Sequence, residues 1–189
     1  MSLPVASHLV EISPGIVQWS AYSEYHKVHL TSHTVIRDGV GLIFDPIPLV
    51  ESAWSGFVRS QPIEWQIVVT NVNHERDSQG WHERLGCSIR LNGGNTLPQW
   101  QVFPLQGGAE WENCFFHSES RLAVIGDALV NLTDRQLEIL PEKYSEDRRR
   151  LREELRILVE LDVETVLLAH GNPVTPGASE KIRGLLEKG

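Results

Sequence analysis

The stretch that decides the fold is IVVTNVNHERD, residues 67–77. It begins inside an apolar run, 65–70, whose length and composition are typical of a strand covered on both faces. Thr70 and Asn71 end this run with polar side chains. Residues 74–85 then mix polar and apolar side chains before Gly86, which predicts a helix closed by a glycine. The sequence therefore predicts a strand that opens into a polar loop and continues into a helix.

Further segments of the same kind lie on both sides of this stretch. Upstream, GLIFDP at 41–46 predicts a strand that is broken by an Asp-Pro pair. Downstream, the segments are PLQGGAE at 104–110, LAVIGDAL at 122–129 and VLLAHGNP at 166–173. The last two are apolar runs that end in glycine and a polar residue, so each predicts a buried strand followed by a turn.

Taken in their order along the chain, the five segments resemble the motifs of the metallo-β-lactamase superfamily. Residues 67–77 are similar to its T-H-x-H-x-D-H signature, and 41–46 to its L-I-D-T-G turn. Residues 104–110, 122–129 and 166–173 are similar to its G-H-T-P-G-S, F-x-G-D-x-L and G-H-G-x-P segments. The resemblance spans residues 41–173 and implies an α/β (α+β) fold, the four-layer αββα sandwich of this superfamily.

The pattern of elements along the chain agrees with such a layered fold. Strands come in meanders and helices follow in each half, which favours two packed sheets with helices outside. The 189 residues suit one domain, 1–189. We expect strands at 15–19, 28–36, 41–44, 65–70, 87–91, 101–105, 113–116, 122–125 and 165–168, a loop at 92–95, and helices at 50–58, 74–85, 133–140, 146–161 and 179–187.

Composition excludes several classes of function. The net charge is −8 and no face is expected to be basic, which argues against a nucleic-acid partner. Two cysteines without CxxC spacing argue against a disulfide scaffold and suit a reducing, cytoplasmic compartment. No apolar stretch approaches the ~20 residues of a membrane span, so we expect no membrane partner.

The resemblance also implies a site for two zinc or iron ions that share an activated water. The three histidines of the first ion carry over to Asn71, Asn73 and Gln106. These carboxamides are neutral and weaker donors to zinc than imidazole, so we expect the first ion to be lost. Together with Arg76 they would then serve as ligand-binding residues, because arginine and amide donors suit a carboxylate or phosphate.

The residues of the second ion are only partly replaced. The resemblance gives Glu75 in place of aspartate, Arg76 in place of histidine, His170 unchanged, and Asp127 as the carboxylate that bridges both ions. A guanidinium group has no lone pair to offer a metal. We therefore expect Arg76 to occupy the place of the ion and to pair with Glu75 and Asp127.

His74 leaves a second arrangement open. With Glu75, Asp127 and His170 it would complete a site for one divalent ion, zinc, manganese or iron. In the alternative interpretation His74 is an ordinary helix-terminal residue that faces solvent, and no metal binds. A structural role is expected for Asp45, and also for the three strand histidines His26, His29 and His33. The tryptophans Trp81, Trp100 and Trp111 are expected to pack in the core, although they could instead line a substrate groove.

Three classes of function follow. The first is a hydrolase-like protein that acts on an ester, thioester or amide, with Asp127, Glu75 and His170 as catalytic residues. The second is a catalytically inactive relative that binds a small, anionic ligand or a partner protein in the old cleft. A structural protein or homo-oligomer is a third reading, because a fold alone does not fix a function.

Overall fold

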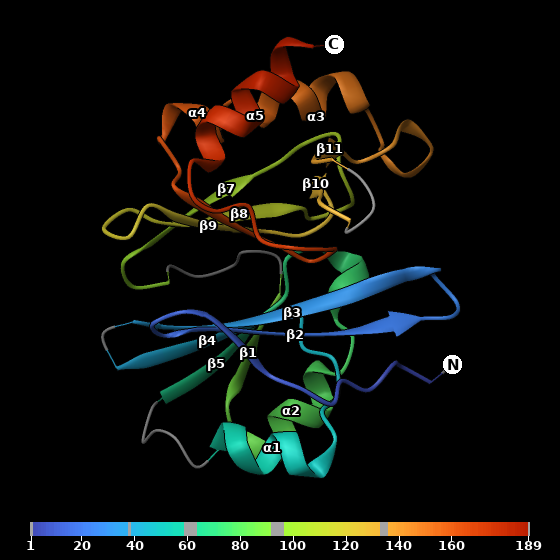
Figure 1. Ribbon diagram of the computed structural model, residues 1–189, viewed down its shortest axis with the longest axis vertical. Coiled ribbons are helices and arrows are strands. Elements are labelled where there is room, and N and C mark those ends of the chain that lie inside the picture. The colour runs from blue at the N-terminus through green and yellow to red at the C-terminus, as the bar shows by residue number, and fades with distance from the viewer. Residues whose placement is uncertain (1, 38, 59–63, 92–96, 133–135, 189) are drawn as a thin grey trace. The chain divides into compact units, whose positions relative to one another are not determined.

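The computed structural model describes residues 2–37, 39–58, 64–91, 97–132 and 136–188 (Figure 1). The chain divides into two compact units that are interleaved in the sequence. The first unit holds Met1–Val69 and His74–Leu91, and the second holds Thr70–Asn73 and Asn92–Gly189. The loop expected at 92–95 lies outside the described residues.

The first unit is built on a six-stranded sheet with the strand order β1-β2-β3-β4-β5-β6. The first four strands are antiparallel neighbours, while β4, β5 and β6 run parallel to one another. The strands are β1 (Val10–Ser13), β2 (Ile16–Ser23), β3 (Val28–Arg37), β4 (Val40–Phe44), β5 (Glu64–Val68) and β6 (Ser88–Arg90), and the helices are α1 (Glu51–Val58) and α2 (Ser78–Leu85).

Helices α1 and α2 both lie on one face of this sheet (Figure 1), and aromatic side chains pack them against it. The rings of Trp19 on β2 and Trp81 on α2 stack with centroids 5.1 Å apart, and Trp54 on α1 meets Trp81 edge-on at 4.6 Å. The indole N–H groups of Trp19 and Trp81 both donate to the carbonyl of Ile47, at 3.0 and 3.2 Å. Trp81 is only 1% exposed. It is therefore a core residue, as one of the two interpretations predicted.

The second unit contains a four-stranded sheet with the order β12-β9-β8-β7 and a small β10-β11 pair. Strand β12 runs parallel to β9, whereas β7, β8 and β9 are antiparallel neighbours. The strands are β7 (Trp100–Pro104), β8 (Asn113–His117), β9 (Leu122–Ile125), β10 (Leu129–Val130), β11 (Glu138–Ile139) and β12 (Thr165–Leu168), and the helices are η2 (Glu142–Tyr144), α3 (Arg148–Glu154), α4 (Ile157–Glu160) and α5 (Ala178–Glu187).

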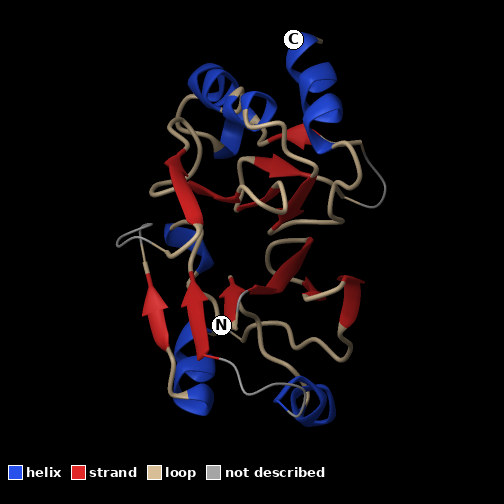
Figure 2. Ribbon diagram, turned by 90° about the vertical axis from the view of Figure 1, so that its left-hand side faces the viewer, coloured by secondary structure: helices blue, strands red, loops and turns tan. Residues whose placement is uncertain are grey.

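Helices α3, α4 and α5 lie on one face of the second sheet (Figure 2). Leu151, Leu158 and Ile182 from these helices are fully buried against Ile125 and Leu168 of the strands. Each unit therefore contributes one sheet and one helical layer, as the predicted layered α/β class requires. The described residues include no helix with the length and apolar character needed to cross a membrane.

Most of the predicted strands and the helices near 50–58 and 179–187 are confirmed, but three predicted helices were wrong in part. Of the helix predicted at 133–140, the described residues 136–140 form β11 and its flanks instead, paired with β10. The helix at 146–161 is divided into α3 and α4, because Arg156 and Leu158 donate to carbonyls only three residues back. The helix at 74–85 begins at Ser78, since Arg76 has a left-handed φ of 44° that no α-helix accommodates.

Candidate active site

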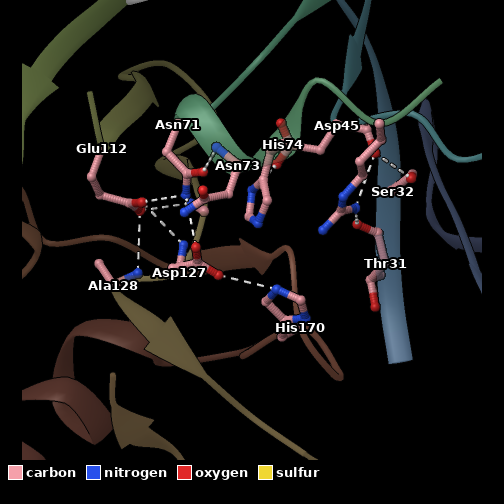
Figure 3. Close-up of polar contacts among 12 residues, drawn as sticks. Thr31, Ser32, Asp45, Asn71, Asn73, His74, Glu112, Asp127, Ala128 and His170 are labelled. Carbon is pink, nitrogen blue, oxygen red and sulfur yellow. Dashed lines mark hydrogen bonds and ion pairs between the residues drawn. The ribbon is translucent and has the colours of Figure 1, made fainter. Parts of the chain in front are cut away.

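The second unit brings two predicted site residues together at one edge of its sheet. Asp127 follows the end of β9, and His170 follows the end of β12. Because these two strands are parallel neighbours, their carboxyl ends meet at the same edge. The imidazole Nε2 of His170 lies 3.0 Å from Oδ1 of Asp127 (Figure 3). The geometry pairs an imidazole with a carboxylate, a combination found in both catalytic and metal sites.

Asn71 contacts this pair from the polar loop that was predicted within residues 67–77. The backbone of Thr70 accepts a hydrogen bond from the N–H of Asn113 at 3.0 Å, which ties the loop to the start of β8. The side chain of Asn71 donates from Nδ2 to Oδ2 of Asp127 at 3.0 Å, and its Oδ1 accepts from the N–H of Asn73 at 2.9 Å. Asn71 is 1% exposed, so this amide is an internal part of the site.

Glu112 completes the network, although it lies outside the sequence motifs described above. Its carboxylate accepts from Asn71 Nδ2 at 2.6 Å (Figure 3). It also accepts from the N–H groups of Gly126, Asp127 and Ala128, at 3.0, 3.2 and 3.2 Å. The signal in the sequence was a charged residue directly before an apolar strand. In the structure Glu112 is 2% exposed, and a carboxylate buried to this degree must be hydrogen-bonded.

The hydrogen bonds of this network show whether Asn71 could be a ligand of the first metal ion. The amide of Asn71 is oriented by its neighbours: two carboxylates require N–H donors, and the N–H of Asn73 requires an acceptor. The nitrogen therefore faces Asp127 and Glu112, and an amide nitrogen offers no lone pair to a metal. Asn71 does not fit a ligand role for the first ion. Asn73 and Gln106, the other predicted carboxamides, are both exposed.

In the first unit, His74 lies in a buried pair with Asp45. Its Nδ1 is 3.0 Å from Oδ2 of Asp45, and the two side chains are 5% and 3% exposed. The interpretation of His74 as a solvent-facing residue was therefore wrong. A carboxylate bonded to Nδ1 fixes the orientation of the ring, and in metal sites this arrangement leaves Nε2 as the ligand atom. The role of His74 as a ligand stays a prediction.

Arg76 makes contacts with the backbone of the same unit. Its Nη1 donates to the carbonyls of Thr31 and Asp45, at 2.7 and 3.0 Å, and the hydroxyl of Ser32 donates to the carbonyl of Asp45 at 2.6 Å. These bonds hold the turn after β4, which agrees with a structural role for Asp45. Glu75 is exposed. The expected pairing of Arg76 with Glu75 and Asp127 stays a prediction.

His33 lies on β3, which agrees with the ordinary strand residue that was expected, and it is buried in this unit. It is 1% exposed, and its Nε2 lies 3.1 Å from Oε1 of Gln18. Burial lowers the pKa of His33 to about 3. The charge of Asp45 raises this pKa and the charge of Arg76 lowers it, but both effects are smaller than that of burial. His26 and His29 are exposed. Trp111 is 46% exposed. Its role in a substrate groove stays a prediction.

We compared the chain with protein-family models, curated proteins and solved structures. No protein-family model matches the chain, and no curated protein matches it. Among solved structures, the DIM-1 metallo-β-lactamase is 15% identical and covers 99% of both chains, with a TM-score of 0.69. A metallo-β-lactamase from Erythrobacter litoralis is 13% identical and covers 100% of this chain and 95% of its own, with a TM-score of 0.64.

A third similar structure is a metallo-β-lactamase family protein from Thermus thermophilus. It is 15% identical, covers 94% of this chain and 79% of its own, and has a TM-score of 0.64. The likeness extends over almost the whole chain in all three cases. This chain has the metallo-β-lactamase fold, which confirms the fold that the sequence motifs predicted.

Proposed function

We propose that this chain is a hydrolase-like protein of the metallo-β-lactamase fold that has lost the dinuclear metal site. At most one divalent ion, zinc, manganese or iron, would bind, with Asp127 and His170 as ligands. The observation that carries this proposal is the amide of Asn71, whose Nδ2 donates to both Glu112 and Asp127. A hydrogen-bond donor stands where a metal ligand would be needed, so a shared pair of ions has no place beside Asp127.

The proposed substrates are small esters, thioesters or amides, whose hydrolysis needs a proton acceptor for the attacking water. In the form without a bound ion His170 is the candidate acceptor, since the carboxylate of Asp127 lies 3.0 Å from its Nε2 and orients the ring. Asn71 holds Asp127 from the other side through Oδ2. Glu75 is proposed as an assisting carboxylate, and Glu75→Gln in the turnover assays tests its contribution.

A second candidate function is a catalytically inactive protein that binds a small anionic ligand or a partner. One observation favours it: both oxygens of Asp127 already have partners, since Asn71 donates to Oδ2 and Nε2 of His170 lies 3.0 Å from Oδ1. The polar groups of the site are thus satisfied without an ion, and a ligand could be held by the exposed carboxamides of Asn73 and Gln106.

Metal analysis of the purified full-length chain tests the proposal. The protein is dialysed against zinc, manganese or iron and its metal content is measured by mass spectrometry, together with the Asp127→Ala variant. We expect at most one ion per chain, and none in the variant. Two tightly bound ions per chain would refute the loss of the dinuclear site.

Turnover decides between the two candidate functions. A panel of small esters, thioesters and amides is screened with and without each metal, using His170→Gln as the test variant. His26→Gln is the matched control because His26 is exposed. Turnover that is lost only in His170→Gln supports the hydrolase. Silence of the native protein across the whole panel supports the binding protein instead.

A further inference from the structure

The carboxylate of Glu112 is seated on the turn that carries Asp127. Oε1 accepts the N–H groups of Gly126 and Ala128, at 3.0 and 3.2 Å, and Oε2 accepts the N–H of Asp127 at 3.2 Å. Successive backbone N–H groups that converge on one point form an anion-binding nest. Here the anion is supplied by the protein itself, because Glu112 lies at the head of β8, the strand next to β9.

The same carboxylate also reaches the loop after β5. Oε2 of Glu112 accepts the amide of Asn71 at 2.6 Å, and this amide donates in turn to Asp127. Glu112 therefore holds Asp127 twice, once through the backbone of its turn and once through Asn71. Asp127 then holds the ring of His170 (Figure 3).

We infer that Glu112 is the positioning residue of this site and holds the Asp127–His170 pair in place without a metal ion. The inference rests on the proposed loss of the dinuclear site, since ions bound to these side chains would otherwise fix their geometry. Glu112 is not a catalytic residue. Its carboxylate is 2% exposed, and both of its oxygens accept hydrogen bonds from the protein.

The test variant is Glu112→Gln, which keeps the shape of the side chain. One oxygen becomes an NH2 group that faces N–H donors, so part of the network is lost and two donors are opposed. The matched control is Glu110→Gln, the same change on an exposed side chain of the same loop. The secondary structure of both variants is compared by circular dichroism before any other measurement.

The readout is the Nε2–H proton of His170, observed by NMR in the full-length chain and assigned with His170→Gln. In the native protein we expect this proton to exchange slowly with solvent, because it is bonded to Asp127 in a partly buried site. In Glu112→Gln we expect exchange to be at least ~10-fold faster, because local opening of the pair then costs less free energy. Glu110→Gln should leave the exchange rate unchanged. A folded Glu112→Gln protein with native exchange would overturn the inference.

Two further measurements keep the inference testable if Glu112→Gln does not fold. The first is the native protein after a chelator has removed divalent ions: we expect the His170 signal to stay in place, and a displaced signal would show that a metal holds the pair. The second is Asn71→Ala, which breaks the side-chain link but keeps the nest, and which should also accelerate exchange. Native exchange in Asn71→Ala would count against the inference. Metal analysis counts the bound ions, whereas the exchange measurements follow the Asp127–His170 pair, so a failure of the proposed function and a failure of the inference are seen in different experiments.

Discussion

The carboxamide nitrogen of Asn71 lies 2.6 Å from Oε2 of Glu112 while it also donates to Asp127. One amide thus separates two carboxylates in a site where Asn71 and Glu112 are nearly inaccessible to solvent. Its two N–H groups satisfy both acids at once, which a side chain without donors cannot do. The identity of residue 71 therefore determines whether the two acids can lie side by side.

Asn71→Asp should destabilise the protein strongly, although it changes the shape of the side chain very little. The variant removes both donors and adds a third acid beside Glu112 and Asp127. We expect a loss of ~2–4 kcal/mol in the free energy of unfolding at neutral pH, measured by urea denaturation. Asn73→Asp is the control, since the side chain of Asn73 is exposed and should change stability by less than ~0.5 kcal/mol. Equal stability of both variants would contradict the role assigned to the Asn71 amide.

Much of the site was predictable because local motifs carry it. Asn71, Asp127 and His170 each lie two or three residues beyond the end of an apolar strand, and the order of these segments along the chain identified the fold. Glu112 could not be found in this way. Its partners lie 14–16 and 41 residues away in the sequence, so its role appears only when β8, β9 and the loop after β5 are side by side.

The wrongly predicted helices have a related cause. A local pattern of apolar residues cannot distinguish a short strand such as β11 from a helical turn when both are buried on one side. Arg76 has a positive φ, and its guanidinium donates to backbone carbonyls of two distant segments. Tertiary contacts of this kind override helix propensity, and no property of residues 74–85 alone reveals them.

Gly126→Ala should damage the site through a single methyl group. A Cβ at this position would lie 2.5 Å from Oγ1 of Thr70, 2.7 Å from Nδ2 of Asn71 and 3.0 Å from Oε2 of Glu112. Because these atoms are buried and hydrogen-bonded, we expect a loss of ~1–3 kcal/mol in the free energy of unfolding. Thermal unfolding followed by circular dichroism measures the effect.

The control for this change is Gly184→Ala in α5. A Cβ at Gly184 would meet no atom within 4 Å among the described residues. Alanine in a helix interior is more favourable than glycine, so this variant should gain ~0.5–1 kcal/mol. Opposite signs for the two substitutions are the expected result. A stabilised Gly126→Ala protein would show that the turn has room to spare.

His74→Ala should show that the pair with Asp45 stabilises the first unit. The substitution removes the imidazole from a buried carboxylate, and we expect a loss of ~2–4 kcal/mol in the free energy of unfolding. Glu24→Ala breaks an ion pair of the same 3.0 Å length between Glu24 and Lys27, whose side chains are 84% and 69% exposed. That control should cost less than ~0.5 kcal/mol in urea denaturation. Similar losses in both variants would contradict the structural role of the buried pair.

Acid should destabilise the fold in part through His33. Burial lowers the pKa of this imidazole from 6.5 to about 3 in the folded chain, so between these two pH values the unfolded chain binds the extra proton. The free energy of unfolding therefore rises with pH in this window, by up to ~1.4 kcal/mol per pH unit from this group. The contribution is fully present above the unfolded pKa and is lost as the pH falls towards 3.

Urea denaturation at pH 7, 6, 5 and 4 measures the slope. His33→Gln, which retains an amide donor towards Gln18, should show a shallower slope than the native protein. The exposed-site variant His26→Gln should keep the native slope, and a native slope in His33→Gln would assign the acid sensitivity to other groups.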